Sequence, residues 1–115
     1  MDDLQALRSA LDRFVAERDW VQFHTPKNLA MALIAEAAEL LEHFQWLTAE
    51  QSRELTPQTR AEVELEIADV LLFLLRLCDK LNIDPLQAAH KKLELNALKY
   101  PVDKARGRAT KYDKL

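Results

Sequence analysis

The spacing of apolar residues along the chain predicts a protein built from helices. Over residues 3–18 apolar side chains recur every three or four positions, as one face of a helix requires. They are Leu4, Leu7, Leu11, Phe14 and Val15. The strict alternation expected of a half-buried strand is absent, and the single glycine, Gly107, leaves little material for tight turns. The pattern therefore predicts an all-α fold.

Three further helices are expected to begin where a capping residue precedes a proline. The pairs are Thr25-Pro26, Thr56-Pro57 and Asp84-Pro85. In each pair the first side chain can accept from a free backbone N–H, and proline suits the first helical position. The helices should cover residues 26–46, 57–81 and 85–99 or 85–100, the last ending before Pro101. Residues 19–25 are expected to form a loop, and the polar stretch 48–57 a turn.

These elements define one domain over residues 1–115, with a helical core over 1–100. The last stretch, 101–115, contains the only glycine, few apolar residues and an excess of basic side chains. We therefore expect a four-helix bundle followed by a basic C-terminal tail.

The helix predicted over residues 57–81 indicates an oligomer. From Val63 to Leu81 apolar residues fall on nearly every side, and a helix of that kind must be buried all round. Four helices in 115 residues can cover one broad face of it. A second subunit, in a homodimer or homotetramer, would cover the other. The alternative is that the first helix and the tail cover it within one chain.

Composition indicates the cellular compartment and the classes of partner to expect. The lone Cys78 lies in an apolar run and cannot form an internal disulfide, as expected of a core residue in a reducing compartment. The start, Met-Asp-Asp-Leu, shows no secretory leader, and the apolar run 70–75 is too short to span a bilayer. A net charge of −3 gives no attraction for a nucleic-acid backbone. We expect a cytoplasmic protein with neither membrane nor nucleic-acid partners.

Two acidic doublets are the candidate metal-binding residues. Glu36-Ala-Ala-Glu39 and Glu66-Ile-Ala-Asp69 each place two carboxylates on one helix face among apolar neighbours. Neither doublet has a Lys or Arg within four residues. Solvated acidic faces are common, but unpaired carboxylates on apolar helices are costly, and two such doublets can share a divalent cation. Oxygen ligands favour Mg²⁺, for which Mn²⁺ can substitute.

Aromatic and polar residues near the acidic helices suggest a nucleotide. Trp20 and His24 are expected on the loop before the second helix and Trp46 at its end. Their aromatic faces can stack on a base, or they can serve as lids on a small core. Lys92, Asn96 and Lys99 form one stripe, either a solvated face or contacts to phosphate oxygens.

The chain resembles the MazG-like all-α nucleoside triphosphate pyrophosphatases, and among them the dCTP pyrophosphatase group. The resemblance covers nearly the whole chain, and its motif is E-E-x-x-E, a spacer, then E-x-x-D. The segments that carry it are 18–24, 26–29, 35–46, 64–71 and 96–101.

The resemblance implies hydrolysis of a nucleoside triphosphate to the monophosphate and pyrophosphate. It also implies dimers or tetramers, and roles for residues at matching positions. Those roles are Mg²⁺ ligation by Glu36, Glu39, Glu66 and Asp69, a base pocket with Trp20, His24 and Trp46, and phosphate or sugar contacts by Lys92 and Asn96.

Three positions depart from the family pattern. Ala35 replaces the first Glu of the motif, as expected in the dCTP-type group. Phe73, a predicted substrate contact, stands where dCTP-type relatives often carry a Tyr hydroxyl, and Leu11 where some place a His near the base.

The groups present indicate that water is the nucleophile, because no Ser–His or Cys–His arrangement is evident. Glu39 is the expected residue to orient or deprotonate that water, which would attack the α-phosphorus. Attack at the γ-phosphorus would need a glycine-rich phosphate loop, and one tail glycine cannot supply it. Two alternatives stay open: a non-catalytic helical oligomerisation module, and a pyrophosphatase for a damaged, methylated or other non-canonical nucleotide.

Overall fold

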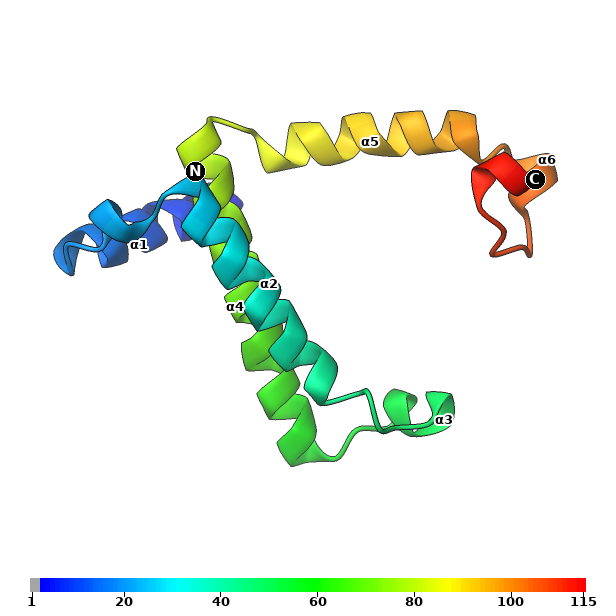
Figure 1. The fold of residues 1–115 in the computed structure, drawn as a ribbon, viewed down its shortest axis with the longest axis horizontal. Helices are drawn as coiled ribbons and strands as arrows, with labels where there is room; N and C mark the ends of the chain where they lie inside the picture. Colours follow the sequence, from blue (N-terminus) through cyan, green and yellow to red (C-terminus); the bar gives the residue numbers. More distant parts are fainter. Residues whose placement is uncertain (1–2) are drawn as a thin grey trace. The chain divides into compact units, whose positions relative to one another are not determined.

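A computed structural model describes residues 3–115, and every regular element in that range is helical (Figure 1). The longer helices are α1 (Asp3–Glu17), α2 (Pro26–Glu42), α4 (Pro57–Leu81) and α5 (Pro85–Lys99). The shorter ones are η1 (Val21–Phe23), α3 (Ala49–Arg53), α6 (Val102–Ala105) and η2 (Tyr112–Lys114). The predicted all-α class is confirmed. Met1 and Asp2, on which the expectation about a secretory leader partly rests, lie outside the described range.

The three predicted helix starts are confirmed by their caps. The side chains of Thr25 and Thr56 accept from the backbone N–H three residues later. Asp84 accepts from the N–H groups of Leu86 and Gln87. Each satisfies donors that the first helical turn leaves free, and the proline that follows has no N–H to satisfy.

Two boundaries differ from the sequence prediction. Helix α2 ends at Glu42 rather than Trp46, because the next residues tighten into turns in which Phe44 N–H donates to the Leu41 carbonyl. The polar stretch expected as a turn contains the short helix α3. Its start is a capping box in which Thr48 and Gln51 exchange side-chain and backbone hydrogen bonds.

The chain divides into two compact units, Met1–Asn82 and Ile83–Leu115, which are described separately. In the first, α2 and α4 lie side by side and run in opposite directions, and α1 packs against α4 (Figure 1). The most deeply buried side chains, one from each of these helices, are Val15, Leu29 and Leu75. Cys78 is also buried, which confirms its place in the core.

Two ion pairs join α1 to α4. Arg8 of α1 pairs with Asp79 of α4, and Asp12 of α1 pairs with Arg76 of α4. The two pairs have opposite polarity, so each helix supplies one cation and one anion. They fix the register of α1 along the last turns of α4.

Large apolar side chains of α2 and α4 are left exposed within this unit. Ile34 of α2 is 69% exposed and Leu65 of α4 is 68% exposed. Met31, Leu41, Ile67 and Leu71 are exposed as well. The apolar character of α4 on nearly every side is therefore not fully covered by the helices of its own unit.

The second unit consists of α5 and the segment after it. The rings of Tyr100 and Tyr112 meet edge to face with centroids 6.1 Å apart, and the Lys99 ammonium lies 4.9 Å from the Tyr112 ring centroid. The last residues therefore fold back against the end of α5. Among residues 3–115, no helix has the length and apolar character needed to cross a membrane.

Candidate active site

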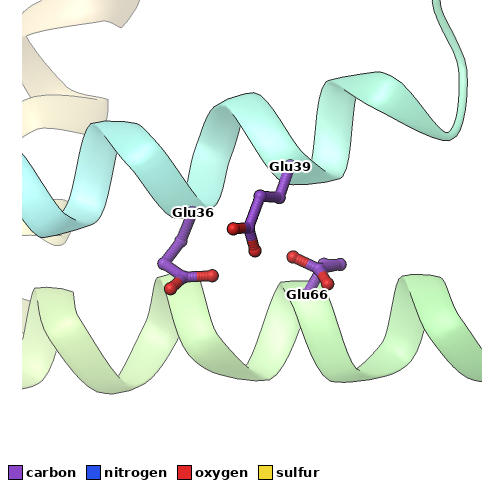
Figure 2. A group of neighbouring side chains, drawn as sticks. All are labelled: Glu36, Glu39 and Glu66. Carbon is purple, nitrogen blue, oxygen red and sulfur yellow. The ribbon is translucent and has the colours of Figure 1, made fainter.

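Three of the predicted metal ligands meet between α2 and α4. Glu36 and Glu39 extend from α2 toward Glu66 of α4 (Figure 2). One carboxylate oxygen from each lies within 4.8 Å of the others. The spacing of three residues sets the two α2 carboxylates on one face, and the antiparallel packing brings α4 opposite them.

Two of these carboxylates are poorly satisfied by the protein. Glu36 Oε2 and Glu66 Oε2 are buried, and no residue within 3–115 donates a hydrogen bond to either atom. A buried polar atom without a partner loses its hydration and gains nothing in return. A bound divalent cation would give both oxygens a partner, so this donor set fits the hard cation predicted from the sequence.

The pKa values of Glu36 and Glu66 also reflect this lack of compensation for their negative charge. Burial, a hydrogen bond with Glu39 and the charges of Glu39, Asp69 and Glu66 raise the pKa of Glu36 to about 7. Burial, with the Glu39 hydrogen bond next in importance, also raises the pKa of Glu66, although His43 opposes the effect. Both shifts mark carboxyls whose charged form lacks compensation, which a bound cation would supply.

The fourth predicted ligand, Asp69, is not part of this group of three. It lies one turn after Glu66 on α4, near enough for its charge to act on both Glu36 and Glu66. Its side chain lines a neighbouring cavity. Asp69 therefore connects the acidic site with that cavity.

The cavity has a volume of about 270 Å³ and lies between α1, the loop after it and α4. Its aromatic walls are Phe14, Trp20 and Phe73, and its aliphatic walls are Leu11, Val15 and Leu72. Phe14 and Trp20 meet edge to face, with centroids 5.8 Å apart. Its polar groups come from His24, Asp69 and Arg76. A small apolar cavity with a few polar groups is typical of a site for a small organic ligand.

Three of the predicted substrate contacts, Trp20, His24 and Phe73, line this cavity. Trp46, by contrast, does not line it and is 86% exposed, because it follows the early end of α2. Lys92 and Asn96 lie on α5 in the second unit, exposed and half-buried respectively, and stay predictions.

His24 has a defined hydrogen-bonding state. Its Nδ1 accepts from Arg76 Nε at 3.2 Å, which assigns the ring proton to Nε2. Burial, followed by the charges of Arg76 and Lys80, lowers the pKa of His24. The imidazole is therefore neutral near pH 7 and has one N–H to donate.

Arg76 is a site residue that the sequence did not indicate. It lies seven residues after Asp69 and three after Phe73, on the same face of α4, yet only 6% of it is exposed. The signal was present as a single cation inside an apolar helical run, on the stripe that contains an acidic motif residue. Arginine in such a run is easily interpreted as the one solvated position of the helix.

Comparison with known proteins identifies the lineage. The sequence profile of the MazG-like family matches residues 32–115. The chain belongs to the MazG-like family. This match includes both acidic doublets and confirms the resemblance inferred from the motifs.

Relatives with named activities support this family assignment. The dCTP pyrophosphatase 1 of Bos taurus is 40% identical over 114 residues, covering 97% of this chain and 68% of the relative. The Homo sapiens protein of the same name is 39% identical, covering 97% and 67%. A solved pyrophosphatase from Archaeoglobus fulgidus superposes with a TM-score of 0.83 at 44% identity, over 88% of this chain and 94% of that one.

Proposed function

We propose that this MazG-like protein hydrolyses a nucleoside triphosphate, dCTP foremost, to the monophosphate and pyrophosphate. The observation that carries the proposal is the pair of half-buried carboxylates, each with one buried oxygen that lacks a partner, beside an aromatic cavity. The relatives named dCTP pyrophosphatase support both the reaction and the nucleotide. A water oxygen forms a bond to the α-phosphorus, and the bond from that phosphorus to the bridging oxygen of the β-phosphate breaks.

Glu36, Glu39 and Glu66 are the proposed ligands of Mg²⁺, with Asp69 next to them as the fourth acid. Mn²⁺ has the same preference for oxygen ligands and should substitute. When bound, the cation lowers the pKa of a coordinated water and offsets the charge of the triphosphate. The carboxylates of α2 and α4 would hold the cation between these two helices.

Glu39 is the proposed catalytic base. It is the exposed member of the acidic group, whereas Glu36 and Glu66 are half-buried. An exposed carboxylate beside the reacting phosphate can reach a water molecule and accept its proton. Glu36 and Glu66 lie between the helices and are less accessible, so they are better suited to bind the cation than to accept a proton from water.

The base of the substrate enters the cavity, where Trp20 and Phe73 offer aromatic faces and His24 an N–H donor. Asp69 lies where the cavity meets the acidic site, so a base in the cavity places the phosphates toward the carboxylates. Trp46 is a further proposed base contact, and Lys92 and Asn96 are proposed contacts for phosphate or sugar oxygens.

We infer that the active form is a homodimer or homotetramer of MazG-like bundles. The exposed apolar surface of α2 and α4, with Ile34 and Leu65 more than half exposed, supports this assembly. Burying such a surface against a second copy is favourable in proportion to the apolar area removed from water.

The proposed function is tested by offering purified protein and Mg²⁺ a panel of canonical nucleoside and deoxynucleoside triphosphates. Pyrophosphate and monophosphate should appear in equal amounts, fastest from dCTP. With ¹⁸O-labelled water the label should enter the monophosphate, because attack is at the α-phosphorus. Glu36→Gln should abolish turnover, and Glu42→Gln, an exposed acid of α2 outside the cluster, should not. Folded protein that releases pyrophosphate from no nucleotide would refute the proposal.

A further inference from the structure

Arg76 is the one charged side chain among residues 3–115 that is buried in the protein, with 8% of its side chain exposed. Removing a guanidinium from water is costly unless its N–H groups find acceptors. The hydrogen bonds of Arg76 therefore show what this position can recognise.

Two of its five N–H groups are occupied. Nη1 donates to Asp12 Oδ1 at 2.8 Å, and Nε donates to His24 Nδ1 at 3.2 Å. No residue within 3–115 accepts from Nη2, so three N–H groups remain available. Because Asp12 and His24 hold the other two, the guanidinium is fixed before any ligand arrives.

The free donors belong to a side chain that lines the cavity. Arg76 lies seven residues after Asp69, which corresponds to about 10 Å along a helix. It is therefore at the end of the cavity away from the acidic site, where a base would lie if its phosphates were at the carboxylates. Asp12 balances its charge, so Arg76 acts on a ligand through directed hydrogen bonds rather than through attraction of phosphate.

We propose that Arg76 is a specificity-determining residue that donates hydrogen bonds to O2 and N3 of cytosine. This inference rests on the proposed function. O2 and N3 are adjacent acceptors, so two N–H groups of one guanidinium can address them together. In thymine and uracil N3 carries a hydrogen, which would face a donor of Arg76 and leave it unpaired. Guanine offers the acceptor pair N7 and O6, but on a larger, bicyclic base.

Asp12 and His24 are positioning residues in this scheme. Each holds one edge of the guanidinium, and Asp12 also neutralises it. His24 then keeps its Nε2–H for a further acceptor in the cavity.

The test is Arg76→Met, which keeps an unbranched apolar side chain at this position and removes every donor. Values of kcat/KM are measured for dCTP, dTTP, dUTP and dGTP. For dCTP we expect a fall of about 10- to 100-fold, the worth of a bidentate base contact, expressed mainly as a higher KM. For dTTP and dUTP little should change, so the preference for cytosine should be largely lost.

Arg8→Met is the matched control. Arg8 also joins α1 to α4 through an aspartate, but it does not line the cavity. Its loss can lower the melting temperature and should leave the ratio of dCTP to dTTP turnover unchanged. If Arg76→Met fails to fold, Arg76→Lys keeps a cation for Asp12 but lacks the planar pair of donors, and it should lose preference without losing the fold.

Binding of the products separates this inference from the proposed reaction. Calorimetric titration with dCMP and dTMP should show wild-type protein preferring dCMP, and Arg76→Met binding both alike. That pattern would support the role of Arg76 even if no triphosphate were hydrolysed. A folded Arg76→Met or Arg76→Lys variant that keeps the full preference for dCTP over dTTP would overturn it.

Discussion

At the scale of the residue, the site could be read from the sequence where chemistry conflicts with its surroundings. Two carboxylates on one face of an apolar helix, without a basic neighbour, indicated the cation site, and the structure brings three of the four together. Arg76 was missed because the sequence does not show that the cation within the apolar run 70–78 faces inward. The orientation of its guanidinium depends on Asp12 and His24, which are distant in sequence.

The raised pKa of Glu36 makes the metal-free protein sensitive to pH. Its pKa rises from 4.5 to about 7 on folding, so between these values the folded state binds more protons than the unfolded state. Stability must then fall as pH rises through this window, and Glu66 acts in the same direction. In EDTA, the melting temperature should fall between pH 5 and pH 8. Glu36→Gln should flatten that fall and Glu42→Gln should not; equal slopes in both variants would contradict the assignment.

Trp20 supplies an aromatic face to the cavity, so its loss should weaken nucleotide binding. Stacking is worth about 1–3 kcal/mol per base, and Trp20→Ala should raise KM for dCTP by roughly 10- to 100-fold with a smaller effect on kcat. Phe23→Ala removes an exposed ring of the same loop that does not line the cavity, and serves as the control. If both variants have the same KM as wild type, Trp20 is only a lid on the core.

At the scale of the element, helix starts were predictable and helix ends were less so. A cap followed by proline is a local signal, and it located α2, α4 and α5 correctly. The end of α2 was placed too late, because neither glycine nor proline marks it and Phe44 continued the apolar pattern. The start of α3 carried the T-x-x-Q signature of a capping box, which a polar composition obscured.

The cap of α4 should matter more than the cap of α3. Thr56 starts the 25-residue helix that carries Glu66 and Arg76, whereas Thr48 starts a helix of five residues. Thr56→Ala should lower the free energy of unfolding by about 1 kcal/mol, measured by chemical denaturation. Thr48→Ala should lower it less, because a short surface helix can fray without disturbing the core. The reverse order would contradict this ranking.

At the scale of the whole molecule, the sequence predicted an all-helical chain, a family and a surface to be covered. The first two are confirmed by the structure and by the match to the MazG-like family. What covers the apolar sides of α4 could not be predicted from one chain. Apolar side chains indicate that a surface is covered, but they do not identify the partner that covers it. The oligomer therefore stays a prediction, supported by the exposed apolar residues of α2 and α4.

The assembly is tested by light scattering at micromolar concentration, which should give at least the mass of a dimer. Leu65→Glu places a charge on a side chain that is 68% exposed within one chain, so it should dissociate the oligomer if that surface is the interface. Leu98→Glu, on α5 at 79% exposure, tests whether any exposed apolar position has the same effect. A stable monomer of wild-type protein would show that the chain covers this surface by itself.

The most direct test of the cation site is the melting temperature of wild-type protein and Glu66→Gln, each with EDTA or with Mg²⁺. Mg²⁺ should stabilise the wild type, by about 2.7 kcal/mol at a hundredfold excess over Kd, and should leave Glu66→Gln unchanged. In EDTA, Glu66→Gln should be no less stable than wild type, because the substitution removes one of several repelling charges. If Mg²⁺ leaves the melting temperature of the wild type unchanged, and Glu66→Gln melts at a lower temperature than wild type in EDTA, these carboxylates bind no cation.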